Sequence, residues 1–348
     1  MELFKQPHRR YNSLTGEWVL VSAQRTERPW LGKTEKSETP AAPFYDPHCY
    51  LCPGNRRASG KINPNYEHTF VFTNDFPALL EQGKNQCFNQ ADLLKAESEC
   101  GICLVICYSP RHDLTLPLLE LTAIERIIQA WQDETRRLGQ RFNSVLIFEN
   151  RGALMGCSNA HPHGQIWANS CLPNLISLED EKQFTFYHKN KKCLLCEYRS
   201  LEENLKERRV IENNSFLVVV PFWAVWPYET LVIPRQHAGD LTGLSPAEVR
   251  DLASILKTLQ TRYDNLFATS FPFSMGIHQN PFSTKEEGYW HWHIHFNPPL
   301  LRSASIQKFM VGYELFAMPQ RDLTAEEAAA RLAALPDLHY TQVAKPSP

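Results

Sequence analysis

The sequence predicts an α+β fold built from two diverged copies of one unit, each with strands, one helix and a last strand that bears histidines. The prediction depends on landmarks that occur twice in the same order: a CxxC pair, an isolated histidine, a helix start, a strand and a closing histidine pair. The cysteine and histidine landmarks are Cys49, Cys52, His112, His161 and His163 in the first copy, and Cys193, Cys196, His237, His291 and His293 in the second. Because five landmarks keep their order, we interpret the chain as a duplication, with an N-terminal copy at 1–175 and a C-terminal copy at 176–348.

Composition places the chain among ordinary globular proteins. It has 348 residues, of which 43% are apolar and 21% charged, enough for a substantial core. The formal net charge is −2 and the isoelectric point is near 6.7. General nucleic-acid binders are usually basic, so this charge balance disfavours that class.

The apolar segments and the cysteines predict a soluble, cytoplasmic protein. The longest apolar run, at 216–226, is too short to span a bilayer and is interrupted by Pro221, so we expect a buried strand there. The first 18 residues contain no apolar signal segment. In a reducing compartment the ten cysteines are expected to be free thiols or metal ligands rather than disulfides.

Each copy is expected to contain one long helix that opens with a capping box. The first would begin with Thr122 and Glu125, and the second with Ser245 and Glu248, where Pro246 suits the first helical position. Apolar residues then recur at helical spacing in both segments. Each helix would be followed by a strand, at 145–150 and at 273–280.

The first CxxC pair predicts a zinc site. Cys49 and Cys52 have the spacing that lets two thiolates chelate one ion from a tight turn. His112 and His161 stand at the next landmarks of the same copy and complete a Cys2His2 set. The simpler alternative is a pair of buried thiols, but the two histidines favour the metal.

The stretch "HPHGQIWA" at 161–168 is expected to carry the chemistry. If it is a strand, then His161, His163 and Gln165 project from one face. His161 is assigned to the metal, so the imidazole of His163 is free to attack phosphorus and form a phosphoramidate. Gly164 would let a phosphate approach the backbone, and Gln165 would donate to a phosphoryl oxygen. Because glutamine is no general acid, the site favours a good leaving group such as a sugar phosphate.

Several stretches resemble the galactose-1-phosphate uridylyltransferases, the transferase branch of the histidine-triad superfamily. The most specific is "GCSNAHPHGQIWA" at 156–168. Other segments are similar to the family in order and nearly end to end. They are "SAQRTERPW" (22–30), "CYLCPGN" (49–55), "NDFPAL" (74–79), "PFWAVWPYETL" (221–231), "YDNLF" (263–267) and "KFMVGYE" (308–314).

The resemblance implies a two-step exchange. His163 would take the uridylyl group from UDP-glucose, release glucose 1-phosphate, and pass the group to galactose 1-phosphate. Ser158 and Gln165 would hold the phosphoryl oxygens. The residues that match nucleotide-binding positions are Arg25, Arg28, Asn74, Asp75 and Asn150, and those that match the hexose-phosphate grip are Lys308, Val311, Tyr313, Glu314 and Gln320. In the family this grip crosses a homodimer interface, so a homodimer is implied.

The resemblance also implies the sheet and a second metal. The family fold is an open, mostly antiparallel half-barrel sheet with helices packed on it, and the two copies would supply its halves. The second metal, iron or zinc, would be bound by Glu179, His278, His293 and His295. It is expected to be structural, because it lies in the copy without the nucleophile.

One expectation goes beyond the family pattern. Cys193, Cys196, His237 and His291 are the duplicated counterparts of the first zinc set, and each is again a zinc-ligand type. They predict an additional zinc in the C-terminal copy; the alternative is a pair of reduced surface thiols with His291 as a spectator.

Two other functions stay open at this point. One is a related nucleotidyltransferase or phosphorylase that acts on ADP-sugars and shares His163. The other is a zinc-stabilised binding module without chemistry. A histidine-triad hydrolase is disfavoured, because its strand normally carries histidine where Gln165 stands.

Overall fold

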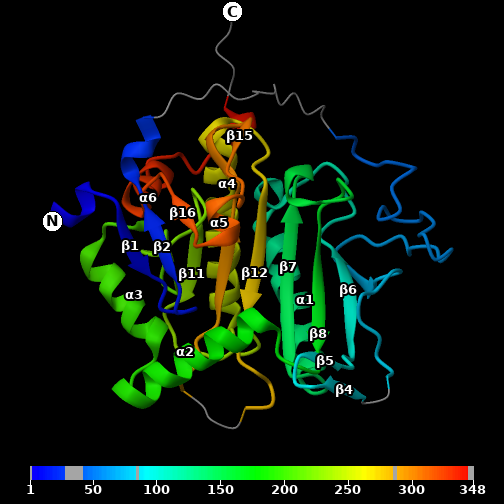
Figure 1. Cartoon of the computed structure of the whole chain (residues 1–348). Helices are drawn as coiled ribbons and strands as arrows, with labels where there is room; N and C mark the ends of the chain where they lie inside the picture. The colour runs from blue at the N-terminus through cyan, green and yellow to red at the C-terminus, as the bar shows by residue number, and fades with distance from the viewer. Residues whose placement is uncertain (1, 28–41, 84–85, 285–287, 344–348) are drawn as a thin grey trace, which may run out of the picture.

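The centre of the molecule is one open sheet of nine antiparallel strands (Figure 1), in the order β3-β6-β8-β7-β12-β13-β11-β10-β9. The structure is a computed structural model that describes residues 2–27, 42–83, 86–284 and 288–343. The strands are β3 (Phe70–Thr73), β6 (Gly101–Cys107), β7 (Ser144–Arg151), β8 (His163–Asn169), β9 (Arg209–Glu212), β10 (Phe216–Val219), β11 (Thr230–Pro234), β12 (Phe273–His278) and β13 (His293–Asn297). The α+β class with an open antiparallel sheet is confirmed.

Helices and short sheets surround this centre. The helices are α1 (Leu121–Gly139), α2 (Asn174–Asn190), α3 (Leu194–Leu205), α4 (Pro246–Phe267), α5 (Tyr313–Phe316) and α6 (Ala325–Ala333). The strands outside the main sheet are β1 (His8–Tyr11), β2 (Trp18–Val21), β4 (Cys87–Gln90), β5 (Leu94–Glu97), β14 (Leu300–Ser303), β15 (Ile306–Gln307) and β16 (Gln320–Arg321). In the part of the chain that the structure describes, no helix combines the length and apolarity needed to cross a membrane.

The strand order reads the same from either side of the middle. Outward from the centre, β7, β8, β6 and β3 of the first copy match β12, β13, β11 and β10 of the second. The two copies meet where β7 pairs with β12 and Ile147 lies opposite Ile277. This pseudo-twofold order is what a duplication produces. The boundary between residues 175 and 176 remains a prediction.

The long helices cover one face of the sheet and form the main core. Ile128 of α1 and Leu256 of α4 belong to one buried cluster with residues of both copies, such as Ile166 of β8 and Val218 of β10. Because side chains alternate along a strand, the neighbours of these residues face the other way. Leu217, next to Val218, packs instead against residues at the start of α3.

The face of the main sheet that α1 and α4 do not cover packs against different segments in the two copies. In the second copy it packs against α3, through Leu194 and Leu195, and α2 lies close by (Figure 1). In the first copy, Cys49 and Cys52 pack against β6 through Val105 and Cys107. His163 and Gln165 lie on this same face, because they pair across β6 with Cys107 and Val105. The CxxC segment thus lies over the strand next to the one that bears His163.

Of the two predicted helix starts, one was wrong in detail and one was confirmed. The cap of α1 is Glu120 rather than Thr122, and Glu120 makes no side-chain cap bond. A 3-10 turn, Leu116–Leu118, leads directly into the helix, so that the carbonyl of Glu120 accepts from Ala123 and Ile124. By contrast, α4 begins as predicted, with a capping box of Ser245 and Glu248 behind Pro246.

The strand with the histidine pair begins later than predicted. β8 starts at His163, so His161 is not part of the same regular strand face. Pro162 has no N–H to give to a strand ladder, and the N–H of His161 donates instead to Asn159 Oδ1 at 2.8 Å. The ring of His161 is completely buried, whereas His163 is only partly so.

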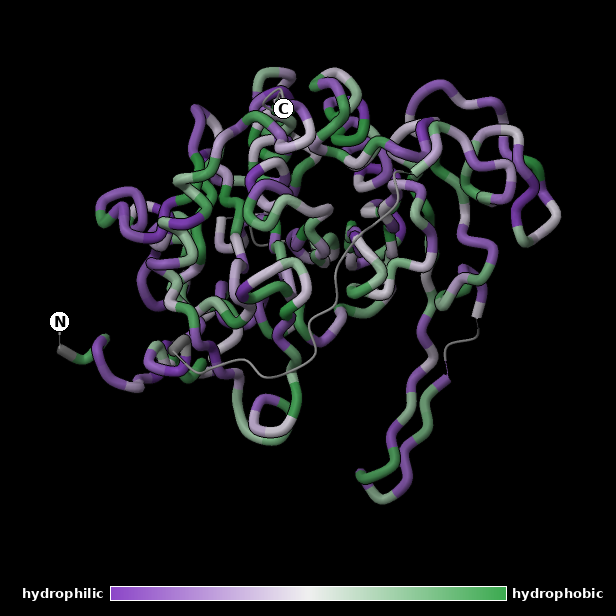
Figure 2. Tube along the Cα trace, turned by 90° about the horizontal axis from the view of Figure 1, so that it is seen from above, coloured by the Kyte–Doolittle hydropathy of each residue, from purple (hydrophilic) through white to green (hydrophobic). Residues whose placement is uncertain are grey.

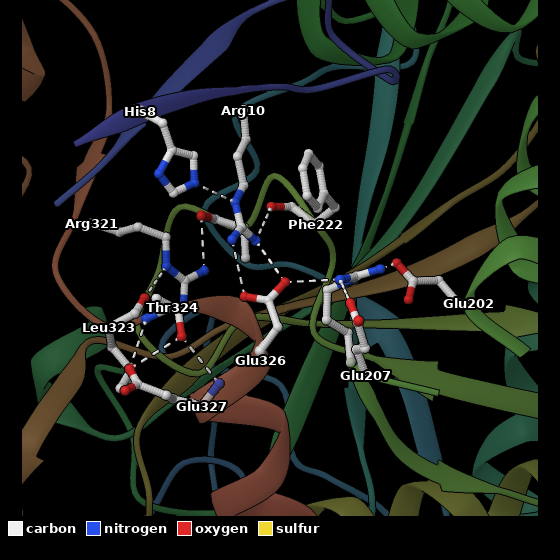
Figure 3. Close-up of polar contacts among 12 residues, drawn as sticks. His8, Arg10, Glu202, Glu207, Phe222, Arg321, Leu323, Thr324, Glu326 and Glu327 are labelled. Carbon is white, nitrogen blue, oxygen red and sulfur yellow. Dashed lines mark hydrogen bonds and ion pairs between the residues drawn. The ribbon is translucent and has the colours of Figure 1, made fainter. Parts of the chain in front are cut away.

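The first strands of the chain, β1 and β2, form a small sheet with β16, which lies far along the sequence. β2 pairs with β1 and, in parallel, with β16 near the C-terminus. Figure 3 shows the ion pairs beside this sheet: Arg10 donates to both carboxylate oxygens of Glu326 on α6, at 2.9 and 3.0 Å. Arg208 donates to the same carboxylate at 2.8 Å and to Glu202 at 2.9 Å. Three remote parts of the chain therefore meet at one carboxylate.

A two-stranded hairpin extends away from the rest of the molecule (Figure 2). It consists of β4 and β5, whose residues are all exposed. Its turn carries an exposed Leu93, next to an exposed Leu94.

Candidate active site and metal clusters

His163 is held in the tautomer that a nucleophile needs. Its Nδ1–H donates to the carbonyl oxygen of His161 at 2.7 Å, which leaves the lone pair on Nε2 free. Burial lowers the pKa of His163, so the ring is neutral at physiological pH. A neutral imidazole with a fixed tautomer can attack an electrophilic phosphorus.

Gln165 lies two residues further along the same strand face, with its amide oriented. The indole Nε1–H of Trp167 donates to Gln165 Oε1 at 3.0 Å. With the oxygen thus occupied, the amide NH2 is the group left to donate to a ligand beside His163. The phosphoryl-binding role of Gln165 stays a prediction, and this orientation leaves a donor available for it.

A cavity of about 850 Å³ opens where β6 and β7 end and β8 begins. A much smaller hollow, of about 30 Å³, lies beside Gln165. Asn150, Ser158 and His163 line both. The structure therefore brings Ser158, Asn150, His163 and Gln165 together. Asn150 is fixed by Ser274 of β12, whose hydroxyl donates to its side-chain oxygen at 2.7 Å.

Glu149 is a cavity residue that the sequence analysis missed. It is buried on the core side of β7, where Tyr108 donates to its carboxylate at 3.0 Å. Burial raises the pKa of Glu149 to about 7, although the charge of Arg151 opposes this. Two charged residues at core-facing positions of a strand were the signal in the sequence: in "IFENR" the alternation that buries Ile147 also buries Glu149 and Arg151.

Gly164 is needed for a reason that the sequence analysis did not give. A Cβ at this position would lie 2.5 Å from the Tyr108 hydroxyl and 3.2 Å from the carbonyl oxygen of Phe148. Gly164 is buried and lies on the opposite side of the strand from His163 and Gln165. Gly164 therefore gives room to Tyr108 behind the strand, and it also lines the small hollow beside His163 and Gln165. The approach of a phosphate to its backbone stays a prediction.

The four residues of the predicted first zinc site converge. Cys49, Cys52, His112 and His161 are all buried, and their ligand atoms lie within 4.8 Å of one another. Cys52 Sγ is 3.6 Å from His112 Nδ1 and 3.5 Å from His161 Nδ1. His161 donates its Nε2–H to the carbonyl of Ser109 at 2.9 Å, which turns the Nδ1 lone pair toward the thiols. Burial lowers the pKa of His161 to about 4, so it is a neutral ligand.

The second predicted set converges as well, under α2. Glu179 extends from α2 toward three histidines of β12 and β13; its carboxylate oxygens lie 2.8 Å from His278 Nδ1, 3.4 Å from His293 Nε2 and 3.6 Å from His295 Nε2. The Nε2 atoms of His293 and His295 are buried and have no hydrogen-bond partner. Such atoms fit metal ligands, because a buried polar atom otherwise needs a partner. Burial lowers the pKa of His295 to about 4.

Cys193, Cys196, His237 and His291 form a third set with the same 4.8 Å spread. All three predicted ligand sets are thus assembled by the fold.

The residues predicted to grip the hexose phosphate lie away from the cavity beside His163, and Arg25 of the predicted nucleotide set contacts the same acid as one of them. Arg25 and Gln320 meet at one carboxylate, since both donate to Asp322 Oδ1, at 3.1 and 2.6 Å. Lys308 donates to Glu314 at 2.8 Å. Val311 and Tyr313 are exposed. Among the residues described, none of the predicted set at 308–320 lines the cavity beside His163.

The predicted uridine-side residues lie at the end of β3. Asn74 donates its N–H to the carbonyl of Cys103 at 2.8 Å. Asp75 accepts from the backbone of Ser59 at 3.2 Å and lies 3.7 Å from Arg57. Neither lines the cavity among the described residues. Arg28 falls outside the described residues.

Two family models together match nearly the whole chain. "Galactose-1-phosphate uridyl transferase, N-terminal domain" matches residues 1–173, and the C-terminal domain of the same family matches residues 179–344. The chain belongs to the galactose-1-phosphate uridylyltransferase family. It is an enzyme of the transferase class. The galactose-1-phosphate uridylyltransferase of Haemophilus influenzae is 51% identical over 98% of each chain, and that of Rattus norvegicus is 49% identical over 96% of this chain and 89% of the relative.

Solved structures support the uridylyltransferase fold. One described as "Structure of uridylyltransferase" covers 94% of this chain and 97% of its own, with 27% identity and a TM-score of 0.74. An ADP-glucose phosphorylase from Arabidopsis thaliana covers 95% of this chain and all of its own, also with a TM-score of 0.74 but with 23% identity. The second likeness shows a shared fold alone, so the substrate must be argued from the sequence relatives and the site.

Proposed function

We propose that this transferase exchanges a uridylyl group between UDP-glucose and galactose 1-phosphate through a covalent intermediate on His163. The observation that carries the proposal is the free Nε2 of His163 at a cavity that Ser158 and Asn150 also line. The relatives that are 49–51% identical over nearly the full chain carry the name of this activity, which supports these substrates.

In the first half-reaction Nε2 of His163 attacks the α-phosphorus of UDP-glucose. A P–N bond forms while the bond from the α-phosphorus to the bridging oxygen breaks, and glucose 1-phosphate leaves with the electron pair. Nδ1 keeps its proton, and the hydrogen bond to the His161 carbonyl stabilises the positive charge that develops on the ring. A sugar phosphate needs no proton to leave, so Gln165 can take the place of an acid.

In the second half-reaction a phosphate oxygen of galactose 1-phosphate attacks the same phosphorus. The P–N bond breaks, the imidazole recovers its electron pair, and UDP-galactose is released. Gln165 and Ser158 donate to the non-bridging oxygens, where charge develops in both transition states. Arg25, Arg28, Asn74, Asp75 and Asn150 are proposed to hold the nucleotide, and Lys308, Val311, Tyr313, Glu314 and Gln320 the hexose phosphate.

Two metals are proposed to support this site without entering the chemistry. The set of Cys49, Cys52, His112 and His161 suits zinc, because two thiolates and two imidazoles fill a tetrahedral shell and leave no open position. The ion would hold His161, whose carbonyl fixes His163. The set of Glu179, His278, His293 and His295 suits iron or zinc, and it would join α2 to the second half of the sheet.

A homodimer and a reducing compartment complete the proposal. The residues proposed to grip the hexose phosphate lie away from the cavity in their own chain, and the α5 segment exposes Val311, Tyr313 and Phe316, whose exposed fraction is 85%. An apolar group of this kind favours burial against a second copy. All ten cysteines are free, as expected of a cytoplasmic protein.

The test is intact-mass measurement of the zinc-replete protein mixed with UDP-glucose alone. We expect a gain of one uridylyl group, lost again on addition of galactose 1-phosphate. A His163→Gly variant that folds should gain nothing. An adduct on that variant would contradict the assignment of His163.

The same measurement separates the two alternatives. An ADP-sugar enzyme of the same fold predicts an adenylyl adduct from ADP-glucose and little uridylyl adduct. A zinc-stabilised binding module predicts no adduct from either. We expect the uridylyl adduct to form faster, because the relatives that are 49–51% identical over nearly the full chain carry the uridylyltransferase name.

A further inference from the structure

Four metal-ligand side chains converge on the outer side of the second copy. Cys193 is the N-cap residue of α3 and Cys196 lies in its first turn. His237 follows β11, and His291 comes two residues before β13. These residues come from three segments separated in the sequence, yet one ligand atom from each lies within 4.8 Å of all the others.

The distances between these atoms fit a tetrahedral ion. Zinc bonds of about 2.0–2.3 Å that meet at tetrahedral angles separate the ligand atoms by roughly 3.3–3.8 Å. Cys196 Sγ lies 3.5 Å from His237 Nδ1 and 3.4 Å from His291 Nδ1. The two Nδ1 atoms are 3.2 Å apart.

The hydrogen bonds of His291 direct its lone pair into the cluster. Its Nε2–H donates to the carbonyl oxygen of Pro234 at 3.1 Å. In the neutral ring Nδ1 is then an acceptor, and it points toward His237 Nδ1 and Cys196 Sγ. A cation placed between these atoms can accept all their lone pairs at once.

The first zinc cluster shows the same geometry in the other copy. There, Cys52 Sγ lies 3.6 and 3.5 Å from the two Nδ1 atoms, and His161 also donates its Nε2–H to a backbone carbonyl. The ring centroids are 5.4 Å apart between His112 and His161, and 5.2 Å apart between His237 and His291. The two copies also agree at the histidine two residues later. His293 Nδ1 donates to the His291 carbonyl at 2.9 Å, and His163 Nδ1 donates to the His161 carbonyl in the same way.

We propose that Cys193, Cys196, His237 and His291 bind a zinc ion, pseudosymmetric with the one proposed for Cys49, Cys52, His112 and His161. All four ligand positions come from the protein, so the ion is structural. It ties the start of α3 to the segments beside β11 and β13. The N-terminus of α3 favours the negative charge of the thiolates, and the exposed His237 lies on a path by which the metal can enter.

A redox pair of thiols explains fewer of these observations. CxxC at a helix start also occurs in thiol–disulfide enzymes, but such a pair needs no imidazoles. Here Nδ1 of His237 and Nδ1 of His291 both lie beside Cys196 Sγ. The cluster of the first copy has two histidines in the same arrangement around Cys52 Sγ. The proposal is independent of the transferase activity, because none of the four residues is placed at the cavity.

The test is to locate and count zinc in the full-length protein. Anomalous diffraction of zinc-replete wild-type crystals should show a peak about 2.3 Å from both Cys193 Sγ and Cys196 Sγ. A Cys193→Ser, Cys196→Ser double variant should contain one zinc fewer per chain than wild type. It is expected to fold, because serine is a favoured N-cap residue at position 193.

The matched control replaces two cysteines outside the clusters. A Cys87→Ser, Cys171→Ser variant removes two exposed thiols and should keep the wild-type zinc content. Absence of the anomalous peak in zinc-replete wild type would overturn the proposal, and so would equal zinc content in wild type and the Cys193, Cys196 variant. A Cys193–Cys196 disulfide in protein purified under reducing conditions would overturn it too. If the double variant does not fold, the wild-type map decides.

Discussion

At the scale of single residues, each of two side chains in the candidate site has one polar atom bonded and another left available for a ligand. His163 is bonded at Nδ1 and free at Nε2, and Gln165 is bonded at its oxygen and free at its amide nitrogen. Both bonds come from neighbours on the same short stretch, His161 and Trp167. The stretch therefore carries its own orientation, independent of the residues across the cavity.

Replacement of Gln165 tests this arrangement. Gln165→Glu keeps the shape and lets Trp167 still donate, but it exchanges the donor for a negative charge facing the phosphoryl group. We expect the single-turnover rate of adduct formation from UDP-glucose to fall by about 10²–10³-fold, the usual effect of losing one oxyanion donor. The melting temperature should change little.

The matched control is Trp167→Phe. It keeps the donor, removes the bond that orients it and replaces the indole that packs on Phe148 by a smaller ring, so it should slow the same step less than Gln165→Glu does. A Gln165→Glu enzyme that forms the adduct at near the wild-type rate would show that Gln165 is not a phosphoryl donor.

The residues of the central motif were predictable because they are contiguous and their chemistry is distinctive. His163, Gln165 and the ligand sets could be named before the fold was known, and the fold brings the ligand sets together. Glu149 was not predicted, although the alternation along its strand that buries Ile147 also buries Glu149. Its hydrogen-bond partner, Tyr108, follows directly after β6 and lies 41 positions away in the sequence, so no local pattern reveals this contact.

At the scale of elements, the N-terminal strand is held by charge as well as by pairing. Glu326 on α6 accepts two hydrogen bonds from Arg10 of β1 (Figure 3). It accepts a third from Arg208, which precedes β9. Burial alone would raise the pKa of Glu326, but the bonds and charge of the two arginines lower it to about 2. The carboxylate thus contributes stability over most of the pH range.

The lowered pKa of Glu326 predicts that the Glu326→Gln substitution reduces the free energy of unfolding by an amount that depends on pH. A carboxylate with a lowered pKa stabilises the fold above its ordinary value of about 4.5, and the contribution is lost as pH falls toward about 2. At pH 7 the variant should lose roughly 2–3 kcal/mol of unfolding free energy, less than the full shift implies, because the side chain is partly exposed. The difference from wild type should shrink below pH 4.5.

The control is Glu207→Gln. Glu207 contacts the same Arg208 at 3.0 Å, but its side chain is 58% exposed, so its loss should cost less than about 1 kcal/mol. Denaturant unfolding of the three proteins at several pH values measures both effects. A constant gap between Glu326→Gln and wild type from pH 7 to pH 3 would contradict the ionic explanation.

Such a contact is beyond sequence prediction, because Arg10 and Glu326 are 316 positions apart. Periodicity and capping signals report on neighbours along the chain, and they predicted α4 and its cap correctly. The same signals misplaced the cap of α1, where the buried 3-10 turn before the helix sets the start.

At the scale of the whole molecule, the proposed dimer can be tested directly. In it, each active site would combine His163 of one chain with Lys308 of the other. A heterodimer of one His163→Gly chain and one Lys308→Ala chain, isolated through two different affinity tags, pairs the two defects in one site and leaves the other intact. We expect about half the activity of wild type, while each homodimeric variant is strongly impaired. Sites built within single chains would leave every site of the heterodimer defective.

The mirrored strand order has a consequence for how many substrates one chain can hold covalently. His293 stands in the second copy where His163 stands in the first, with the same backbone bond to the histidine two residues earlier. Yet its Nε2 faces Glu179 at 3.4 Å beneath α2, instead of an open cavity. The two copies thus contain equivalent imidazoles, those of His163 and His293. Because α2 places Glu179 against His293, only His163 is available for the proposed reaction. If His163 forms the proposed intermediate, we therefore expect complete labelling to give one nucleotide per polypeptide, even though the polypeptide contains the unit twice.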